Sequence, residues 1–148
     1  MKPETKIQSI EEPVLSLVEG HRRAKRSRPP DSGLATVEEA IDEYRRGRFV
    51  IIVDDEGREN EGDLTLPAEF VTEEAISFML RHTSGIICVP LSGERLDQLR
   101  IPLMVGNNQA QYGTAFTISV DARFGITTGV SAHDRACPIR VLADPASV

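Results

Sequence analysis

Two stretches of the chain place apolar residues at helical spacing, each directly after a threonine. In the first, Thr36 and Glu39 have the spacing of a capping box, and Gly47 supplies a stop signal. The side chains expected on the buried face of this helix are Val37, Ala40, Ile41 and Tyr44. The pattern predicts a helix of about three turns that leads into an apolar strand.

The second stretch begins at Thr72, the predicted N-cap of another helix. Val71 precedes this cap and can pack against Ile76 as a hydrophobic staple. The side chains expected on the buried face are Ala75, Ile76, Met79 and Leu80. Residues 92–99 have the pattern of a third, brief helix.

The last predicted helix covers residues 132–136. Ser131 is its predicted N-cap, and Asp134 occupies the third helical position. Pro138 follows within the same pattern, where proline typically costs ~3 kcal/mol or ends the helix.

Four segments have strand patterns. Residues 49–53 and 85–89 are short apolar runs that fit buried strands, and residues 64–70 form another predicted strand. Residues 114–121 alternate in strand fashion. The apolar positions on one side of this last segment are Phe116, Ile118 and Val120. The mixture indicates an α/β or mixed α+β fold, and the pattern alone leaves these two open.

Composition indicates one domain with an aliphatic core. The chain has 148 residues, of which 40% are hydrophobic and 5% aromatic, and it has no tryptophan. The first 34 residues carry seven Lys or Arg and five Asp or Glu, with a proline pair near their end. This composition is typical of a disordered basic extension. We therefore expect an extension over residues 1–34 and a folded domain over residues 35–148.

Charge and cysteine content argue against several function classes. Residues 35–148 carry ten basic and eighteen acidic side chains, which argues against a nucleic-acid-binding surface. No apolar stretch approaches the roughly 20 residues of a membrane span, and the N-terminus lacks the apolar core of a signal peptide. Cys88 and Cys137 lie far apart in the sequence and lack metal-ligand spacing, which suggests two reduced thiols. We expect a cytoplasmic protein with no nucleic-acid or membrane partner.

Ten residues, 54–63, carry the most distinctive chemistry of the chain and are named here the acid loop. They hold six carboxylates, two glycines and Arg58, and they follow directly on the apolar run 49–53. Such a segment is either a solvated acidic surface or a site for a divalent cation or a general base. Arg58 and the glycines favour a defined backbone with an anion partner.

Four blocks carry a family resemblance: VDDEGRENEGDL, RHTSGIICVPL, IPLMVGNNQAQYGTAFTISVDA and GITTGVSAHDRA. In this order they resemble the N-terminal two thirds of 3,4-dihydroxy-2-butanone-4-phosphate synthase, over about residues 36–141. The resemblance implies that family's α/β fold and a homodimer. It also implies a lyase of riboflavin biosynthesis that uses Mg²⁺ or Mn²⁺ to convert D-ribulose 5-phosphate to 3,4-dihydroxy-2-butanone 4-phosphate and formate.

The resemblance also implies roles for residues of the acid loop. Glu59 matches the metal-binding glutamate, and Arg58 with Glu59 matches the pair that contacts the sugar phosphate. Asp63 matches a substrate-binding aspartate. Proton transfer next to a ketose carbonyl also needs acids and bases. The carboxylates that we take as catalytic candidates are Asp54, Asp55, Glu59 and Asp63, with the individual roles of Asp54 and Asp55 left open.

Two candidates lie outside the acid loop. Cys88 occupies a family position near the active site, although a cysteine within residues 85–89 is equally explained as a small buried hydrophobe. Thr128 belongs to a hydroxyl-rich turn before a helix, which suits a phosphate. Ser131 in the same turn is also explained as a plain helix cap. For His82, interaction with the helix dipole is a commoner role than metal or substrate binding.

The resemblance stops before an R-x-G-H-T-E-A segment, which supplies the family's second metal ligand, and before a later catalytic glutamate. The sequence therefore predicts a fold that is incomplete at the C-terminus and a weakened metal site. Three hypotheses follow. The chain is a working lyase, completed by a second chain at the dimer interface, or a catalytically incompetent fragment that retains part of the fold and of the dimer surface. Otherwise it is a metal-binding module built on the acid loop, whose spacing does not fit a calcium-binding loop.

Overall fold

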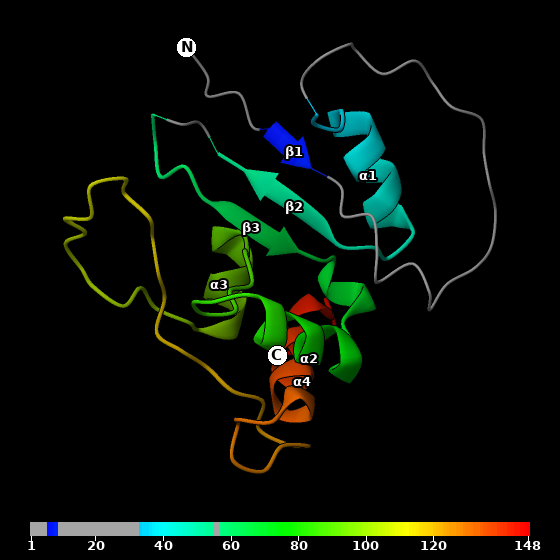
Figure 1. Cartoon of the computed structure of the whole chain (residues 1–148). Helices are drawn as coiled ribbons and strands as arrows, with labels where there is room; N and C mark the ends of the chain where they lie inside the picture. The colour runs from blue at the N-terminus through cyan, green and yellow to red at the C-terminus, as the bar shows by residue number, and fades with distance from the viewer. Residues whose placement is uncertain (1–5, 9–32, 55–56) are drawn as a thin grey trace. The chain divides into compact units, whose positions relative to one another are not determined.

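The computed structural model describes residues 6–8, 33–54 and 57–148 (Figure 1). The chain divides into two compact units, Met1–Phe70 and Val71–Val148. Most of the predicted extension over residues 1–34 lies outside the described residues, so that boundary stays a prediction. Within it, residues Lys6–Gln8 form a strand.

In its described residues, the first unit has a three-stranded antiparallel sheet and the α-helix α1 (Val37–Arg45). Its strands, in spatial order, are β1 (Lys6–Gln8), β2 (Val50–Val53) and β3 (Gly62–Thr65). The predicted strand over residues 64–70 is therefore misplaced: β3 begins two residues earlier and ends before Pro67. The following residues Ala68–Phe70 form the 3₁₀ helix η2 instead, since proline cannot donate to a strand ladder.

Helix α1 (Val37–Arg45) has the predicted capping box. The Thr36 hydroxyl accepts from the Glu39 N–H at 3.2 Å, and the Glu39 carboxylate accepts from the Thr36 N–H at 2.8 Å. Gly47 follows with φ of +70°, and a Cβ there would lie 2.8 Å from the Phe70 ring. Both the positive φ and the close ring explain glycine as the stop signal.

The core of the first unit is small. Ala40 of α1 and Val50 of β2 are 6% and 2% exposed, and Tyr44 and Ile52 pack against them. The Tyr44 hydroxyl also contacts the Thr65 hydroxyl. The predicted buried face of α1 is wrong at Val37 and Ile41, which are 52% and 42% exposed, because the side chains of α1 that pack in this small core are Ala40 and Tyr44.

The second unit consists of helices and extended segments. Its helices are α2 (Glu73–His82), α3 (Gly93–Leu99) and α4 (Ala132–Ala143). Thr72 and Ser131 are the N-caps of α2 and α4, as predicted, and Ser92, predicted only as the start of the third helix, caps α3. Helices α2 and α4 pack together around Ile76 and Ala136, both 0% exposed. Val71 is buried as the staple predicts, whereas Leu80 is 46% exposed. No helix among the described residues is both long and apolar enough to span a membrane.

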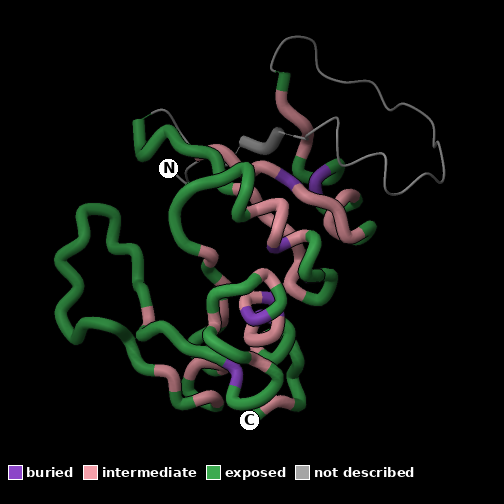
Figure 2. The backbone as a smooth tube through the Cα atoms, turned by 60° about the horizontal axis from the view of Figure 1, so that its bottom comes forward, coloured by how far each residue is buried: buried purple, intermediate pink, exposed green. Residues whose placement is uncertain are grey.

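Two predicted strands of this unit are absent. Residues 85–89 have no strand pairing, and residues 114–121 form one isolated bridge, between Leu103 and Thr117. These residues are largely exposed, drawn in green in Figure 2. A strand needs a hydrogen-bonded neighbour, and in the described part of the chain only the sheet of the first unit supplies paired strands.

Helix α4 also differs from its prediction over residues 132–136, since it continues through Pro138 to Ala143. Ala136 and Ile139 are buried on either side of the proline. Their packing favours a continuous helix over the local cost of the missing N–H. Beyond its end, Arg95 donates to the carbonyls of Asp144 and Ser147, at 2.7 and 3.0 Å.

Candidate active site

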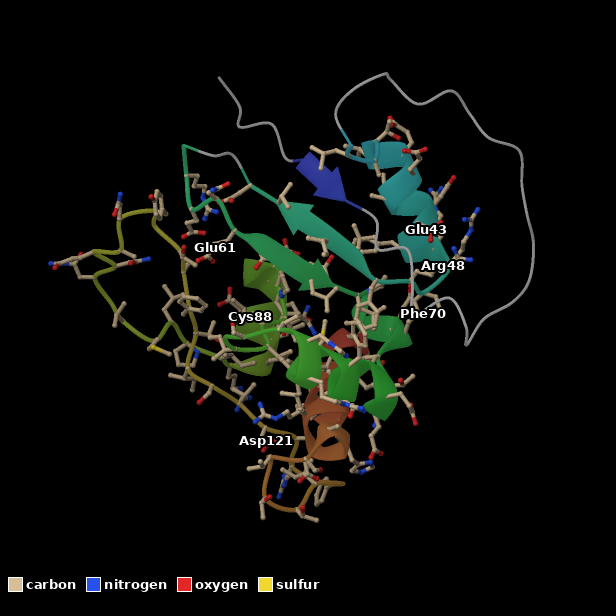
Figure 3. All side chains as sticks on the ribbon, viewed as in Figure 1. Glu43, Arg48, Glu61, Phe70, Cys88 and Asp121 are labelled. Atoms are coloured by element: carbon tan, nitrogen blue, oxygen red, sulfur yellow. The ribbon has the colours of Figure 1, made fainter. Side chains whose placement is uncertain are left out.

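The acid loop connects β2 to β3 as the turn of a hairpin. The pairing of Val53 with Gly62 is extended by a hydrogen bond from the Asp54 N–H to the Glu61 carbonyl, at 3.3 Å. Asn60 has φ of +53°, a conformation that asparagine tolerates better than most residues. The candidate Asp55 lies outside the described residues, so its role stays a prediction. Figure 3 labels Glu61, where the loop enters β3.

The carboxylate of Asp54 organises this loop. One oxygen accepts from the Glu61 N–H at 2.8 Å, and the other accepts from the Glu59 N–H at 3.0 Å and from Arg58 Nη1 at 2.7 Å. These bonds, the one from Glu61 first, hold the pKa of Asp54 below its ordinary value. Asp54 is therefore ionised at neutral pH, and it accepts hydrogen bonds from three donors.

Arg58 and Glu59 form the exposed tip of the arrangement. Arg58 Nη1, already bonded to Asp54, lies 2.8 Å from the Glu59 carboxylate. The two side chains are 42% and 36% exposed. The hydrogen bond to Asp54 raises the pKa of Arg58 above its ordinary value, and the charge of Glu59 adds to this effect. The result is a fixed cation beside a carboxylate that solvent can reach.

Asp63 lies on β3 itself, opposite Ile52 of β2. Opposed residues of an antiparallel pair share a face of the sheet, so Asp63 shares the face of Ile52. It is exposed. The structure thus brings Asp54, Arg58 and Glu59 into direct contact and places Asp63 on the adjoining strand.

The other two candidates belong to the second unit. Cys88 is exposed, which contradicts its interpretation as a small buried hydrophobe, because the segment 85–89 is not a buried strand (Figure 3). Thr128 is exposed in the turn before α4. His82 ends α2 with its ring centroid 4.5 Å from that of Phe78.

A second organising carboxylate, Asp134, was not identified as such from the sequence. It is 1% exposed and accepts from the Thr127 N–H at 3.0 Å, the Thr127 hydroxyl at 2.8 Å and the Gly129 N–H at 3.2 Å. The Thr127 hydroxyl is the first cause of its lowered pKa. These bonds fix the turn that presents Thr128. The sequence signal was an aspartate in the first turn of a helix, which by itself indicates only a favourable dipole interaction.

The described residues suit a Mg²⁺ ion that keeps several of its waters better than a metal ion enclosed by protein ligands. In residues 33–54 and 57–148, no three His, Cys, Asp or Glu side chains come together as a metal-binding group. Mg²⁺ commonly keeps several waters and uses one or two carboxylates together with substrate oxygens. An exposed carboxylate such as that of Glu59 suits this mode.

Residues 38–148 match the family model of 3,4-dihydroxy-2-butanone 4-phosphate synthase. The synthase of that name from Schizosaccharomyces pombe is 53% identical over 112 residues, which are 76% of this chain and 55% of the relative. The riboflavin biosynthesis protein RibBA of Nocardia farcinica is 57% identical over 109 residues, 74% of this chain and 26% of that protein.

A solved structure of a synthase of the same name, in complex with two magnesium ions, is similar in fold. Its TM-score is 0.74 at 48% identity, and the match covers 76% of this chain and 53% of that one. A second, from Candida albicans, has a TM-score of 0.66 at 50% identity, covering 76% and 55%. The chain spans about half the length of these three synthases and about a quarter of the RibBA protein.

Proposed function

Because this chain belongs to the 3,4-dihydroxy-2-butanone 4-phosphate synthase family, we propose that it serves the conversion of D-ribulose 5-phosphate to 3,4-dihydroxy-2-butanone 4-phosphate and formate. This lyase reaction belongs to riboflavin biosynthesis. The observation that carries the proposal is the Arg58–Glu59 pair, held at the tip of the acid loop by Asp54. The names of the relatives support the same reaction.

The pair offers two complementary charges to a phosphorylated ketose. The guanidinium of Arg58 can donate to phosphate or enediolate oxygens, while Glu59 offers a carboxylate oxygen to a hard cation. A bound Mg²⁺ or Mn²⁺ stabilises the negative charge that develops when a proton is removed next to the carbonyl. Glu59 is the residue that would hold it.

The remaining candidates take roles around this pair. We assign proton transfer to Glu59 and Asp63, since both carboxylates are exposed and can reach a substrate. Asp54 has its oxygens bonded to three donors, so we assign it chiefly to positioning Arg58 and Glu59. Cys88 and Thr128 are proposed to contact the substrate, Thr128 at its phosphate.

We also propose that the functional form is a cytoplasmic homodimer. The family resemblance is the support for the dimer. The acidic balance of the chain and the two free thiols support the location. No nucleic-acid or membrane partner forms part of the proposal.

The decisive experiment is an assay of formate release from D-ribulose 5-phosphate by the purified 148-residue chain with Mg²⁺. We expect turnover that falls by about 100-fold or more in Glu59→Gln, because the carboxylate for the metal and for proton transfer is lost. Glu69→Gln, an exposed glutamate of η2, is the matched control and should keep full turnover. A folded wild-type chain without turnover would refute the proposal and favour the incompetent-fragment hypothesis.

A further inference from the structure

Arg135 of α4 is hydrogen-bonded to the turn that precedes its own helix. Its Nε donates to the Val130 carbonyl at 2.8 Å. The neighbouring residue of the helix, Asp134, is buried and accepts from the Gly129 N–H at 3.2 Å. Thr128, directly before Gly129, is exposed. The first turn of α4 therefore holds the backbone after Thr128 by one N–H and one carbonyl, while Thr128 itself stays open to solvent.

Two carboxylates lie against this turn. One is that of Asp134, and the other is that of Asp121, whose Oδ2 would lie 2.5 Å from a Cβ added at Gly129. Figure 3 labels Asp121 on the segment that leads to the turn. Both groups repel a phosphate that approaches Thr128. A phosphate can be held here only if a positive charge lies beside it.

The guanidinium of Arg135 supplies a positive charge at this place. Among the described residues, Arg135 is the arginine whose side chain hydrogen-bonds the turn, whereas the guanidinium carbon of Arg123 lies 5.3 Å from the Phe124 ring centroid. Val130 uses the Nε donor, and the N–H donors of the two Nη groups remain for a ligand. The two residues from Thr128 to Val130 span at most about 7 Å of backbone. One phosphate with a hydrogen bond on each side can bridge this distance.

We propose that Arg135 is a further substrate-binding residue, whose Nη groups hold the phosphate of the phosphorylated ketose against Thr128. This inference rests on the proposed function, in which Thr128 contacts that phosphate. A guanidinium offers two parallel N–H donors to two phosphate oxygens, and a lysine ammonium lacks this geometry. The bond to Val130 orients the guanidinium before the substrate arrives, so little side-chain freedom is lost on binding.

The test is an NMR titration of the 148-residue chain with D-ribulose 5-phosphate and, separately, with inorganic phosphate. Both ligands should shift the amide signals of Thr128 and Gly129. We expect Arg135→Gln to raise the Kd of both ligands at least 10-fold, and Arg135→Lys to raise them by less, because a lysine keeps the charge without the paired donors. Arg140→Gln is the matched control, an exposed arginine later in the same helix, and should change either Kd less than 2-fold.

A merely structural role of Arg135 is tested by amide hydrogen exchange at Gly129 without ligand. This amide donates to Asp134, so its exchange should stay unchanged in Arg135→Gln. Faster exchange there, in step with the loss of binding, would overturn the proposal in favour of a structural role. Circular dichroism checks that each variant remains folded.

Three further results would overturn the proposal. They are a wild-type chain that binds neither ligand at Thr128, an Arg135→Gln chain that binds both as tightly as the wild type, and an equal loss of binding in Arg140→Gln. The assay of formate release separates this inference from the proposed function. Binding that depends on Arg135 in a chain without turnover would refute the proposed function and leave the assignment of Arg135 to the phosphate in place.

Discussion

Asp54 in the acid loop and Asp134 in α4 each use one carboxylate to bind three donors of a neighbouring turn. Asp54 binds one guanidinium and two backbone N–H groups, and Asp134 binds two backbone N–H groups and the Thr127 hydroxyl. Burial separates them: the side chain of Asp54 is 20% exposed, whereas Asp134 is 1% exposed. A carboxylate that binds three donors therefore occurs both in a partly exposed loop and in a buried position.

This difference in burial assigns the two aspartates different tasks. An acceptor removed from a buried site leaves donors that water cannot reach, whereas donors in an exposed hairpin turn rehydrate easily. Asp134 should contribute mainly to the stability of its unit. Asp54 should contribute mainly to the local order of Arg58 and Glu59, which is what a binding site requires.

The largest expected effect is that of Asp134→Ala. Three donors of the turn before α4 lose an acceptor that is itself buried, so we expect the melting midpoint to fall by about 10 °C, measured by circular dichroism. Asp134→Asn keeps one side-chain oxygen and should fall by less. Asp97→Ala, an exposed aspartate of α3, is the control and should change the midpoint by less than about 2 °C. Equal midpoints for Asp134→Ala and Asp97→Ala would contradict the role of Asp134.

Asp54→Ala should have a smaller effect on the midpoint and a clear local one. We expect the midpoint to change by less than about 3 °C, while amide exchange at Glu59 and Glu61 accelerates by about 10-fold or more. The measurement is hydrogen exchange followed by NMR. Asp42→Ala removes only the exposed ion pair with Arg45 and should leave these amides unchanged. If Asp54→Ala left both amides protected, the loop would owe its order to the hairpin alone.

The sequence predicted correctly those features of the fold that depend on residues close together in the chain. The helix N-caps Thr36, Thr72 and Ser131 were correct, because the start of a helix depends mainly on the cap and on the residue three positions later. The strands 85–89 and 114–121 were wrong because pairing depends on distant segments. Pro138 was also misjudged, since the packing of α4 on α2 is a tertiary effect.

The candidate site shows the same division. The acid loop was found from its composition and its place after an apolar run, and its residues received roles only through family resemblance. The acceptor roles of Asp54 and Asp134 could not be predicted, because each depends on a turn whose backbone directs several donors at one carboxylate. No spacing rule encodes that convergence.

The smallest expected effect, in pH dependence, probes the acid loop most directly. Its hydrogen bonds place the pKa of Asp54 below the unfolded value of about 3.9, so the bonds are fully present above that pH and are lost as pH falls through the folded pKa. Protection of the Glu61 amide, relative to an unfolded reference, should therefore exceed that in Asp54→Asn by a constant factor above about pH 5. The excess should shrink toward zero in stronger acid. Exchange at the Gly129 amide depends on the buried carboxylate of Asp134 instead, so Asp54→Asn should leave it unchanged. Faster exchange at Gly129 in Asp54→Asn would show that the two turns are not independent.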